Sequence, residues 1–200
     1  MFAPLTRLVL PATVLPVPLA DALVHLKAQG CPADEQTYIT GLLKTVADAF
    51  TRESKQALMQ ATYASAYPNF WHGGVLSDLR GPVLAVESLT YRAADGTTVT
   101  VAATDYALSI YDPGTLTLKP TYETTLPRAL YRPGAVDAVQ VRYRAGYATA
   151  ADVPVEIRAW VLLTLGHWYE NRQSVAVGLN VSEVPHTARQ LMNLIREPSL

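Results

Sequence analysis

The chain has 200 residues, of which half are apolar, and its 16 Lys and Arg against 17 Asp and Glu leave a formal net charge of −1. This length suffices for one domain with a substantial core and argues against a second full domain. The charge balance gives no indication of a polyanion or a membrane surface as partner. The single cysteine, Cys31, excludes an intrachain disulfide and a multi-cysteine metal site.

Residues 1–18 are predicted to form an extended N-terminal arm, because prolines that fix φ and remove a backbone donor interrupt its apolar run. A cleaved signal peptide is disfavoured, since the segment carries one basic residue, Arg7, where a signal peptide begins with a positively charged region. We expect Met1–Val17 and roughly Val175–Leu200 to be mobile in a free monomer and to become ordered on assembly.

Two helices are predicted next, over residues 19–28 and 34–58. In the first, leucines recur at helical spacing and Asp21 lies in the first turn, where the helix dipole favours an acid. The second is the more strongly amphipathic, with Asp34 and Glu35 at its start. Its apolar stripe consists of Ile39, Leu42, Leu43, Val46, Ala49 and Phe50.

The spacing of the apolar residues then changes from helical to alternating, and residues from about 75 to 147 are predicted to form an antiparallel β-rich insertion. Short β-branched and aromatic runs alternate there with turn signals, which is typical of hairpins. Asp95 and Gly96 predict a two-residue type I′ turn, which needs positive φ at both central positions.

A third main helix is predicted over residues 154–171, apolar on most of its circumference and therefore central in the core. Residues 174–200 are predicted to form a linker and a short C-terminal helix. The expected fold class is α+β, a small helical bundle in a single domain, 19–173, with the β insertion between its main helices.

No motif indicates an enzyme, a cofactor or a metal. A GxSxG nucleophile elbow, a phosphate-binding loop and an HExxH motif are all absent from the sequence. His167 and Glu170 are neighbours on the last main helix, but a second such pair is missing. The apolar segment Val153–Tyr169 carries charged side chains and is therefore not predicted to span a membrane.

The segment 128–147 offers a nucleic-acid alternative, because its arginines are interleaved with Tyr131, Tyr143 and Tyr147. Arginines and stacking rings are a common way to hold single strands. In a strand, however, Arg142 and Arg144 would share a solvent face opposite the apolar residues, where charge also guards a sheet edge. The alternation favours the solvated face, and contact with DNA through these two arginines stays open.

Four segments together resemble a known family, the gp6-like head-tail connector (adaptor) proteins of tailed bacteriophages and gene transfer agents. The resemblance rests on their order and spacing, and the last segment is the most specific. They are PLADALVHLK, ITGLLKTVADAFTRES with ALMQATY, SLTYRAADGTTVTVAATDYAL, and VRYRAGYATAADVPVEIRAWVLLTLGHWYENR. The resemblance assigns no role to the loop Trp71–Gly74.

The resemblance implies a structural protein without catalysis or cofactor. Copies would assemble into a ring, usually twelvefold, beneath the portal. The ring would extend the DNA channel without sequence-specific binding, meet a stopper or tail-terminator protein, and belong to a phage or gene transfer agent particle assembled in the host cytoplasm.

The resemblance also implies two sets of contact residues. At the end of the third helix, Glu170, Asn171 and Arg172 would cap backbone groups or contact a neighbouring subunit. The C-terminal segment would dock on the portal through His186, Arg189, Leu191, Leu194, Ile195 and Arg196.

Overall fold

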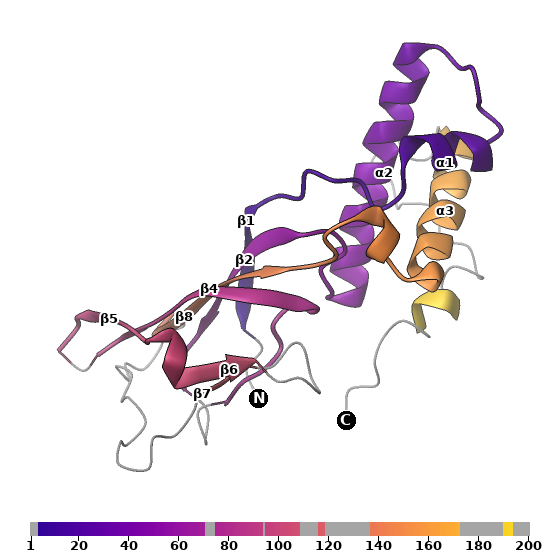
Figure 1. Ribbon diagram of the computed structural model, residues 1–200. Coiled ribbons are helices and arrows are strands. Elements are labelled where there is room, and N and C mark those ends of the chain that lie inside the picture. The colour runs from indigo at the N-terminus through magenta and orange to yellow at the C-terminus, as the bar shows by residue number, and fades with distance from the viewer. Residues whose placement is uncertain are drawn as a thin grey trace. The chain divides into compact units, whose positions relative to one another are not determined.

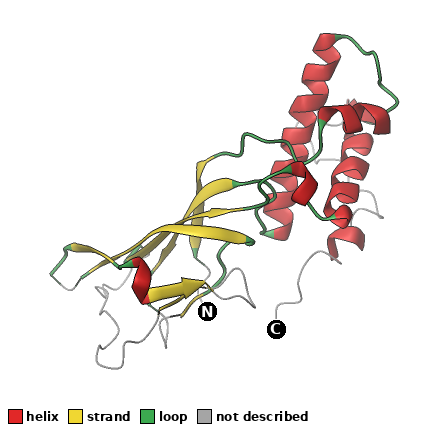
Figure 2. Ribbon diagram, viewed as in Figure 1, coloured by secondary structure: helices red, strands yellow, loops and turns green. Residues whose placement is uncertain are grey.

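A computed structural model describes residues 4–70, 75–93, 95–108, 116–118, 137–172 and 190–193. Its contacts divide the chain into two compact units. The sheet unit consists of residues 1–12 and 60–146, and the helical unit of residues 13–59 and 147–200. All of the α-helices in Figure 1 belong to the helical unit, and all of the labelled strands belong to the sheet unit (Figures 1 and 2). The predicted α+β class is confirmed. The β segment forms a compact unit of its own, and the single domain expected over residues 19–173 stays a prediction.

The helical unit contains α1 (Leu19–His25), α2 (Ala33–Ser54) and α3 (Val155–Glu170). A short 3₁₀ helix, η3 (Ala150–Asp152), precedes α3. The α2 helix ends at Ser54 because Lys55 takes a left-handed conformation with φ of 60°, four residues before the predicted end.

The core of the helical unit follows the periodic apolar residues. Phe50 and Trp160 meet edge to face, with ring centroids 5.5 Å apart, and both are fully buried. Gly166 lies where α1 packs on α3, since a Cβ added there would be 3.5 Å from His25 Nε2. The small-residue side of α3 therefore gives α1 room to approach.

The main sheet of the other unit has the strand order β1-β2-β8-β4-β5, with every neighbouring pair antiparallel (Figure 1). Its strands are β1 (Leu5–Leu10), β2 (Ala61–Tyr67), β8 (Val139–Ala145), β4 (Val83–Arg92) and β5 (Thr98–Thr100). A second sheet has the order β3-β7-β6. Its strands are β3 (Val75–Leu76), β7 (Leu116–Leu118) and β6 (Tyr106–Leu108), the last preceded by η2 (Ala103–Asp105).

Two strands of the main sheet lie outside the predicted insertion. Residues 5–10, expected as part of an extended arm, form the edge strand β1, and β2 starts well before residue 75. The sequence contains one signal for each strand. For β1 it is the proline-free run between Pro4 and Pro11, and for β2 it is the alternation of Tyr63, Ser65 and Tyr67. The low strand propensity of the alanines in β2 hid the second signal.

The predicted type I′ turn at Asp95 and Gly96 is wrong. The amide of Gly96 bonds the carbonyl of Ala93 at 2.9 Å, and the amide of Ala93 bonds the carbonyl of Thr97 at 2.8 Å. This pattern, with Gly96 at φ of 89°, is that of a three-residue hairpin loop. Asp95 also accepts bonds from the Thr97 amide and hydroxyl, which lower the pKa of its carboxyl.

Candidate functional site

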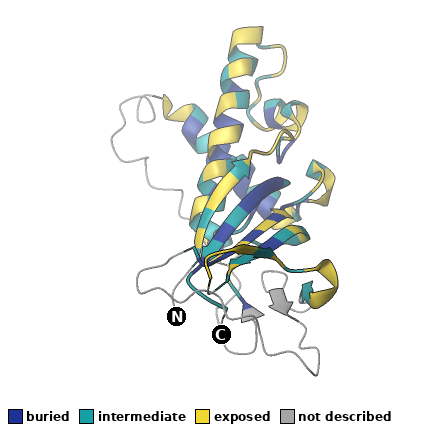
Figure 3. Cartoon of the chain, turned by 90° about the vertical axis from the view of Figure 1, so that its left-hand side faces the viewer, coloured by how far each residue is buried: buried dark blue, intermediate teal, exposed yellow. Residues whose placement is uncertain are grey.

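The outer face of the main sheet carries the two arginines singled out from the sequence. Buried and exposed residues alternate along all of β8, so that Arg142 and Arg144 are exposed while Val141 and Tyr143 are buried. Figure 3 shows buried, intermediate and exposed positions interspersed over the strands of the sheet. The predicted solvent face of this strand is confirmed. We call the side of the sheet that bears Arg142 and Arg144 the outer face.

A carboxylate partly neutralises these arginines. Glu87 of β4 lies 2.7 Å from Arg142 Nε through Oε2 and 3.8 Å from Arg144 Nε through Oε1. One carboxylate therefore pairs with two guanidinium groups, and the cluster keeps a low net charge. These groups are substantially exposed, so the pairs contribute little to stability, typically about 0–1 kcal/mol each.

One of the aromatic rings on which the nucleic-acid alternative depends is not accessible to a base. Tyr143 is fully buried, and its ring stacks on Tyr63 with centroids 5.9 Å apart, so it cannot stack on a base. The earlier members of that segment, Arg128, Tyr131 and Arg132, lie outside the described residues. The described residues thus support the solvated-face interpretation more than the nucleic-acid one.

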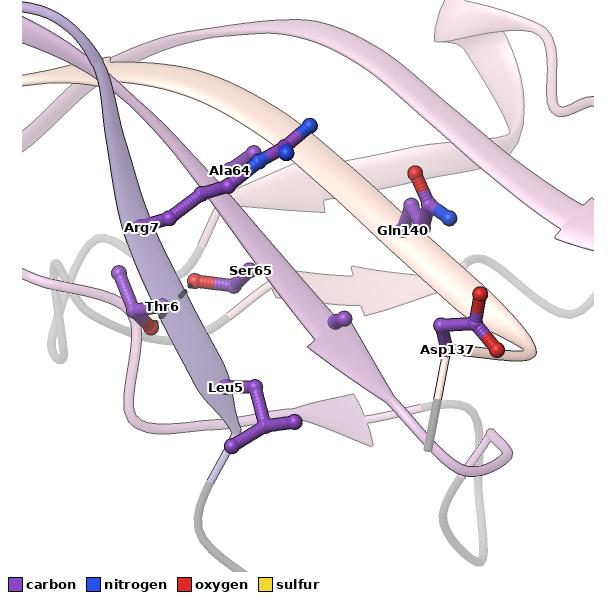
Figure 4. A pocket seen from close by; sticks show the side chains of 8 residues that line it. Leu5, Thr6, Arg7, Ala64, Ser65, Asp137 and Gln140 are labelled. Carbon is purple, nitrogen blue, oxygen red and sulfur yellow. Dashed lines mark hydrogen bonds between the residues drawn. The ribbon is translucent and has the colours of Figure 1, made fainter. Parts of the chain in front are cut away.

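A shallow hollow lies on the outer face between β1, β2 and the start of β8 (Figure 4). Its volume is about 340 Å³, and Ala64 and Ala66 leave it open because their side chains are small. Arg7 and Leu5 border it on β1, and Asp137 and Gln140 on the other side (Figure 4). Thr6 and Ser65 also line the hollow.

Beneath the hollow, hydroxyl groups join three strands. Thr6 Oγ1 lies 2.8 Å from Ser65 Oγ, which lies 3.2 Å from the Tyr143 hydroxyl (Figure 4 shows the first bond). The Tyr143 hydroxyl also accepts the Arg80 amide at 3.0 Å. Burial raises the pKa of Tyr143, so it remains a neutral hydrogen-bonding group. Strand β1 is held to its own sheet by this network.

The predicted helix-end contacts of α3 are made within the chain. Arg172 forms a forked ion pair with Glu35, in the first turn of α2, and its guanidinium lies over the rings of Tyr169 and Tyr38, at 4.3 and 5.0 Å from their centroids. The pKa of the Glu35 carboxyl is lowered most by a hydrogen bond from Tyr169 and next by the hydrogen bonds from Arg172. Tyr38, Glu35, Tyr169 and Arg172 are called the helix-end cluster below.

The other two residues of that prediction differ from Arg172. Asn171 closes the helix, since its amide nitrogen donates to the His167 carbonyl at 2.8 Å and its backbone N–H donates to the same oxygen at 3.1 Å. Glu170 is exposed. Among these three residues, Glu170 is the one whose side chain forms no hydrogen bond or ion pair with the described part of the chain.

The C-terminal segment is described only at residues 190–193, which are helical. Met192 is fully buried in the core of the helical unit, and Leu191 packs against that core while remaining partly exposed. His186, Arg189, Leu194, Ile195 and Arg196 lie outside the described residues, as does the loop Trp71–Gly74. Sequence periodicity did not single out Met192, which attaches this segment to its own bundle.

Over the described ranges, no group of three or more His, Cys, Asp or Glu side chains could hold a metal ion. Within the same ranges, none of the helices combines the length and the apolar character needed to cross a membrane.

No protein-family model matches the chain, and no curated protein matches its sequence. The fold, however, has solved counterparts. One is described as the virion of a native gene transfer agent (GTA) particle, with a TM-score of 0.71, 21% identity, and coverage of 98% of this chain and 97% of that one. At this identity the likeness establishes a shared fold over nearly the whole length of both chains.

Two further structures are GTA necks. The neck of the empty GTA particle, computed with C6 symmetry, has a TM-score of 0.69 at 21% identity and covers 98% of this chain and 97% of that one. The neck of the native GTA particle, computed with C12 symmetry, has a TM-score of 0.64 at 20% identity, with coverage of 100% and 97%.

Proposed function

We propose that this chain is a structural component of the neck of a gene transfer agent or phage particle, and specifically a head-tail connector (adaptor). The observation that carries the proposal is the full-length likeness to chains of GTA virion and neck structures.

In this proposal, copies of the chain form a ring of twelve beneath the portal. The ring extends the DNA channel and joins the capsid vertex to a stopper or tail-terminator protein below. The symmetry of the similar necks, C6 and C12, supports a ring over an isolated monomer. DNA would pass without sequence-specific binding, which fits the low net charge of the Glu87, Arg142 and Arg144 cluster.

The proposed portal contact lies at the C-terminus, in His186, Arg189, Leu191, Leu194, Ile195 and Arg196. Because Met192 is fully buried in the helical core, removal of residues 187–200 would damage the fold as well as the contact. A deletion of residues 194–200 retains Met192 and Leu191 and is the sharper test.

The test is the mass of the purified protein, alone and mixed with its candidate portal, by light scattering after size exclusion. We expect a ring or a stoichiometric portal complex, and loss of the portal complex on deletion of residues 194–200. The exposed Val24→Ala is the matched control and should bind normally. A full-length protein that stays monomeric and ignores the portal would contradict the connector role.

The nucleic-acid alternative is tested in the same preparation. If Arg142 and Arg144 held phosphates, DNA affinity would fall steeply with salt, and Arg142→Ala with Arg144→Ala would flatten that dependence. The connector proposal expects weak DNA binding that these substitutions leave nearly unchanged.

A further inference from the structure

Strand β1 is an open sheet edge with unusual apolar exposure. It pairs with β2 on one side and is the last strand of the main sheet among the described residues. Leu5, Leu8 and Leu10 are 61%, 53% and 55% exposed. Eight large apolar residues of the described chain are exposed, by 37% to 64%, and three of them belong to this one six-residue strand.

Natural sheets protect edges with charge, proline, bulges or a covering element. Here Pro4 and Pro11 bound the strand but do not interrupt it, and Arg7 is its only charge. The register shifts between Leu8 and Leu10, so the edge is bulged but still carries apolar side chains on both sides of the bulge. Such an edge is suited to contact with another protein surface.

The register indicates how the edge presents its side chains. Leu5 is opposite Ala66 and Arg7 is opposite Ala64, and these alanines are opposite Gln140 and Arg142 on the outer face. The 340 Å³ hollow therefore continues inward from the edge, with Leu5 at its rim (Figure 4). It offers room for a side chain from a partner that rests on the edge.

We propose that the open edge of β1 is a subunit interface and that its occupant is a second copy of this chain. This inference rests on the proposed ring, in which every copy must contact a neighbour. The similar necks, computed with C6 and C12 symmetry, support side-by-side copies rather than a single bound partner. The low charge of the edge, with Arg7 alone, argues against DNA as its occupant.

The contact is head to tail. A closed ring of more than two copies needs two different complementary patches on each copy, so β1 meets a surface of the neighbour other than its β1. Pairing of β1 with β1 would be isologous and would stop at a dimer. The edge is also preformed, because the hydroxyl network of Thr6, Ser65 and Tyr143 holds β1 in its own sheet.

The experiment compares Leu5→Lys with Leu10→Lys in one protein against the wild type and a control, Val24→Lys. All three side chains are more than half exposed, but Val24 lies on α1 of the helical unit. Mass is measured by light scattering over a concentration series, with and without the portal, and a thermal melt verifies the fold of each variant. We expect the double variant to melt like the wild type and to remain monomeric, whereas the control forms the ring.

Each outcome separates the two proposals. A double variant that forms the same ring as the wild type overturns the β1 interface and leaves the connector role standing. A wild type that forms only dimers, lost in the double variant, supports contact through β1 but overturns the ring. A wild type that is monomeric under every condition overturns both.

Two further measurements examine the geometry. Amide hydrogen exchange over residues 5–10 should slow on assembly of the wild type and remain unchanged in the double variant. In a Cys31→Ser background, Arg7→Cys should form no disulfide-linked dimer on oxidation, because the interface does not bring β1 against β1. Efficient dimer formation would overturn the head-to-tail contact.

Discussion

The two units differ in whether their buried hydroxyl groups have hydrogen-bond partners. In the sheet unit, the buried Tyr143 hydroxyl bonds Ser65 and the Arg80 amide. In the helical unit, Thr164 Oγ1 and the indole nitrogens of Trp160 and Trp168 are buried with no hydrogen-bond partner among the described residues. A paired buried polar group supports the fold, whereas an unpaired one costs free energy.

The difference arises from how each core is built. The helices satisfy their backbone groups internally, so their core needs only apolar shape, supplied by residues at three and four residue spacing. The sheet includes strands from both ends of its unit, and side-chain hydroxyls fix β1 and β2 beside β8. The same loss of one oxygen should therefore have opposite consequences in the two units.

The largest expected effect breaks the helical core. Trp160→Ala removes a fully buried ring that packs on Phe50, and such a truncation costs about 3–5 kcal/mol. Chemical denaturation followed by circular dichroism measures the free energy of unfolding. Val24→Ala, on an exposed position, is the control and should change stability little. A loss no larger than that of the control would mean that Trp160 is not a core residue.

The next effect tests the hydroxyl network of the sheet. Tyr143→Phe leaves the Arg80 amide without its acceptor and removes one of the two hydroxyl partners of Ser65, at a cost of about 1–3 kcal/mol. Denaturation monitored by tyrosine and tryptophan fluorescence provides the value. Ser65→Ala keeps the Arg80 bond and should cost less, so an equal or greater loss in Ser65→Ala would place the main contribution elsewhere.

The matched substitution in the helices is expected to have the opposite sign. Thr164→Val removes a fully buried hydroxyl that has no partner among the described residues, and it should stabilise the protein by roughly 1 kcal/mol. Thr164→Ser, which keeps the hydroxyl and loses a methyl, should destabilise it. If Thr164→Val were the destabilising variant, the hydroxyl would have a partner in solution.

The smallest effect concerns the helix-end cluster and pH. The Glu35 pKa is lowered below its ordinary 4.5, so its contribution to stability is present above that pH and is lost as pH falls through the lowered folded-state pKa. Carbon-13 NMR titration of Glu35 should show this, and Tyr169→Phe or Arg172→Gln should return its pKa toward 4.5. An unchanged titration in both variants would rule out their role in lowering it.

Much of the helical unit was predictable, because its signals are local. Ile39, Leu43, Val46 and Phe50 recur with the period of a helix, and all are buried as expected. The ends were less accurate, since the left-handed turn at Lys55 depends on local conformation that no apolar pattern records. In the sheet, the alternation of β8 was equally clear, and it correctly placed Arg142 and Arg144 toward solvent.

The candidate interfaces were less predictable. The exposed edge of β1 could not be inferred from LTRLVL, because the same apolar letters would suit a buried strand. Arg172 was recognised as a helix-end residue, but its partner Glu35 is 137 positions away. Met192 at the C-terminus was assigned no core role, because apolar spacing can indicate one face of a helix but does not record what that face packs against.

The sequence by itself determined the α+β class, the three main helices and the outward direction of Arg142 and Arg144, since each follows from the spacing of neighbouring residues. The tertiary structure alone decided that β1 is an edge strand beside β2, that Tyr143 bonds Arg80, and that Glu35 meets Arg172. These contacts join distant segments. Their geometry depends on the packing of the whole unit, which a local pattern does not encode.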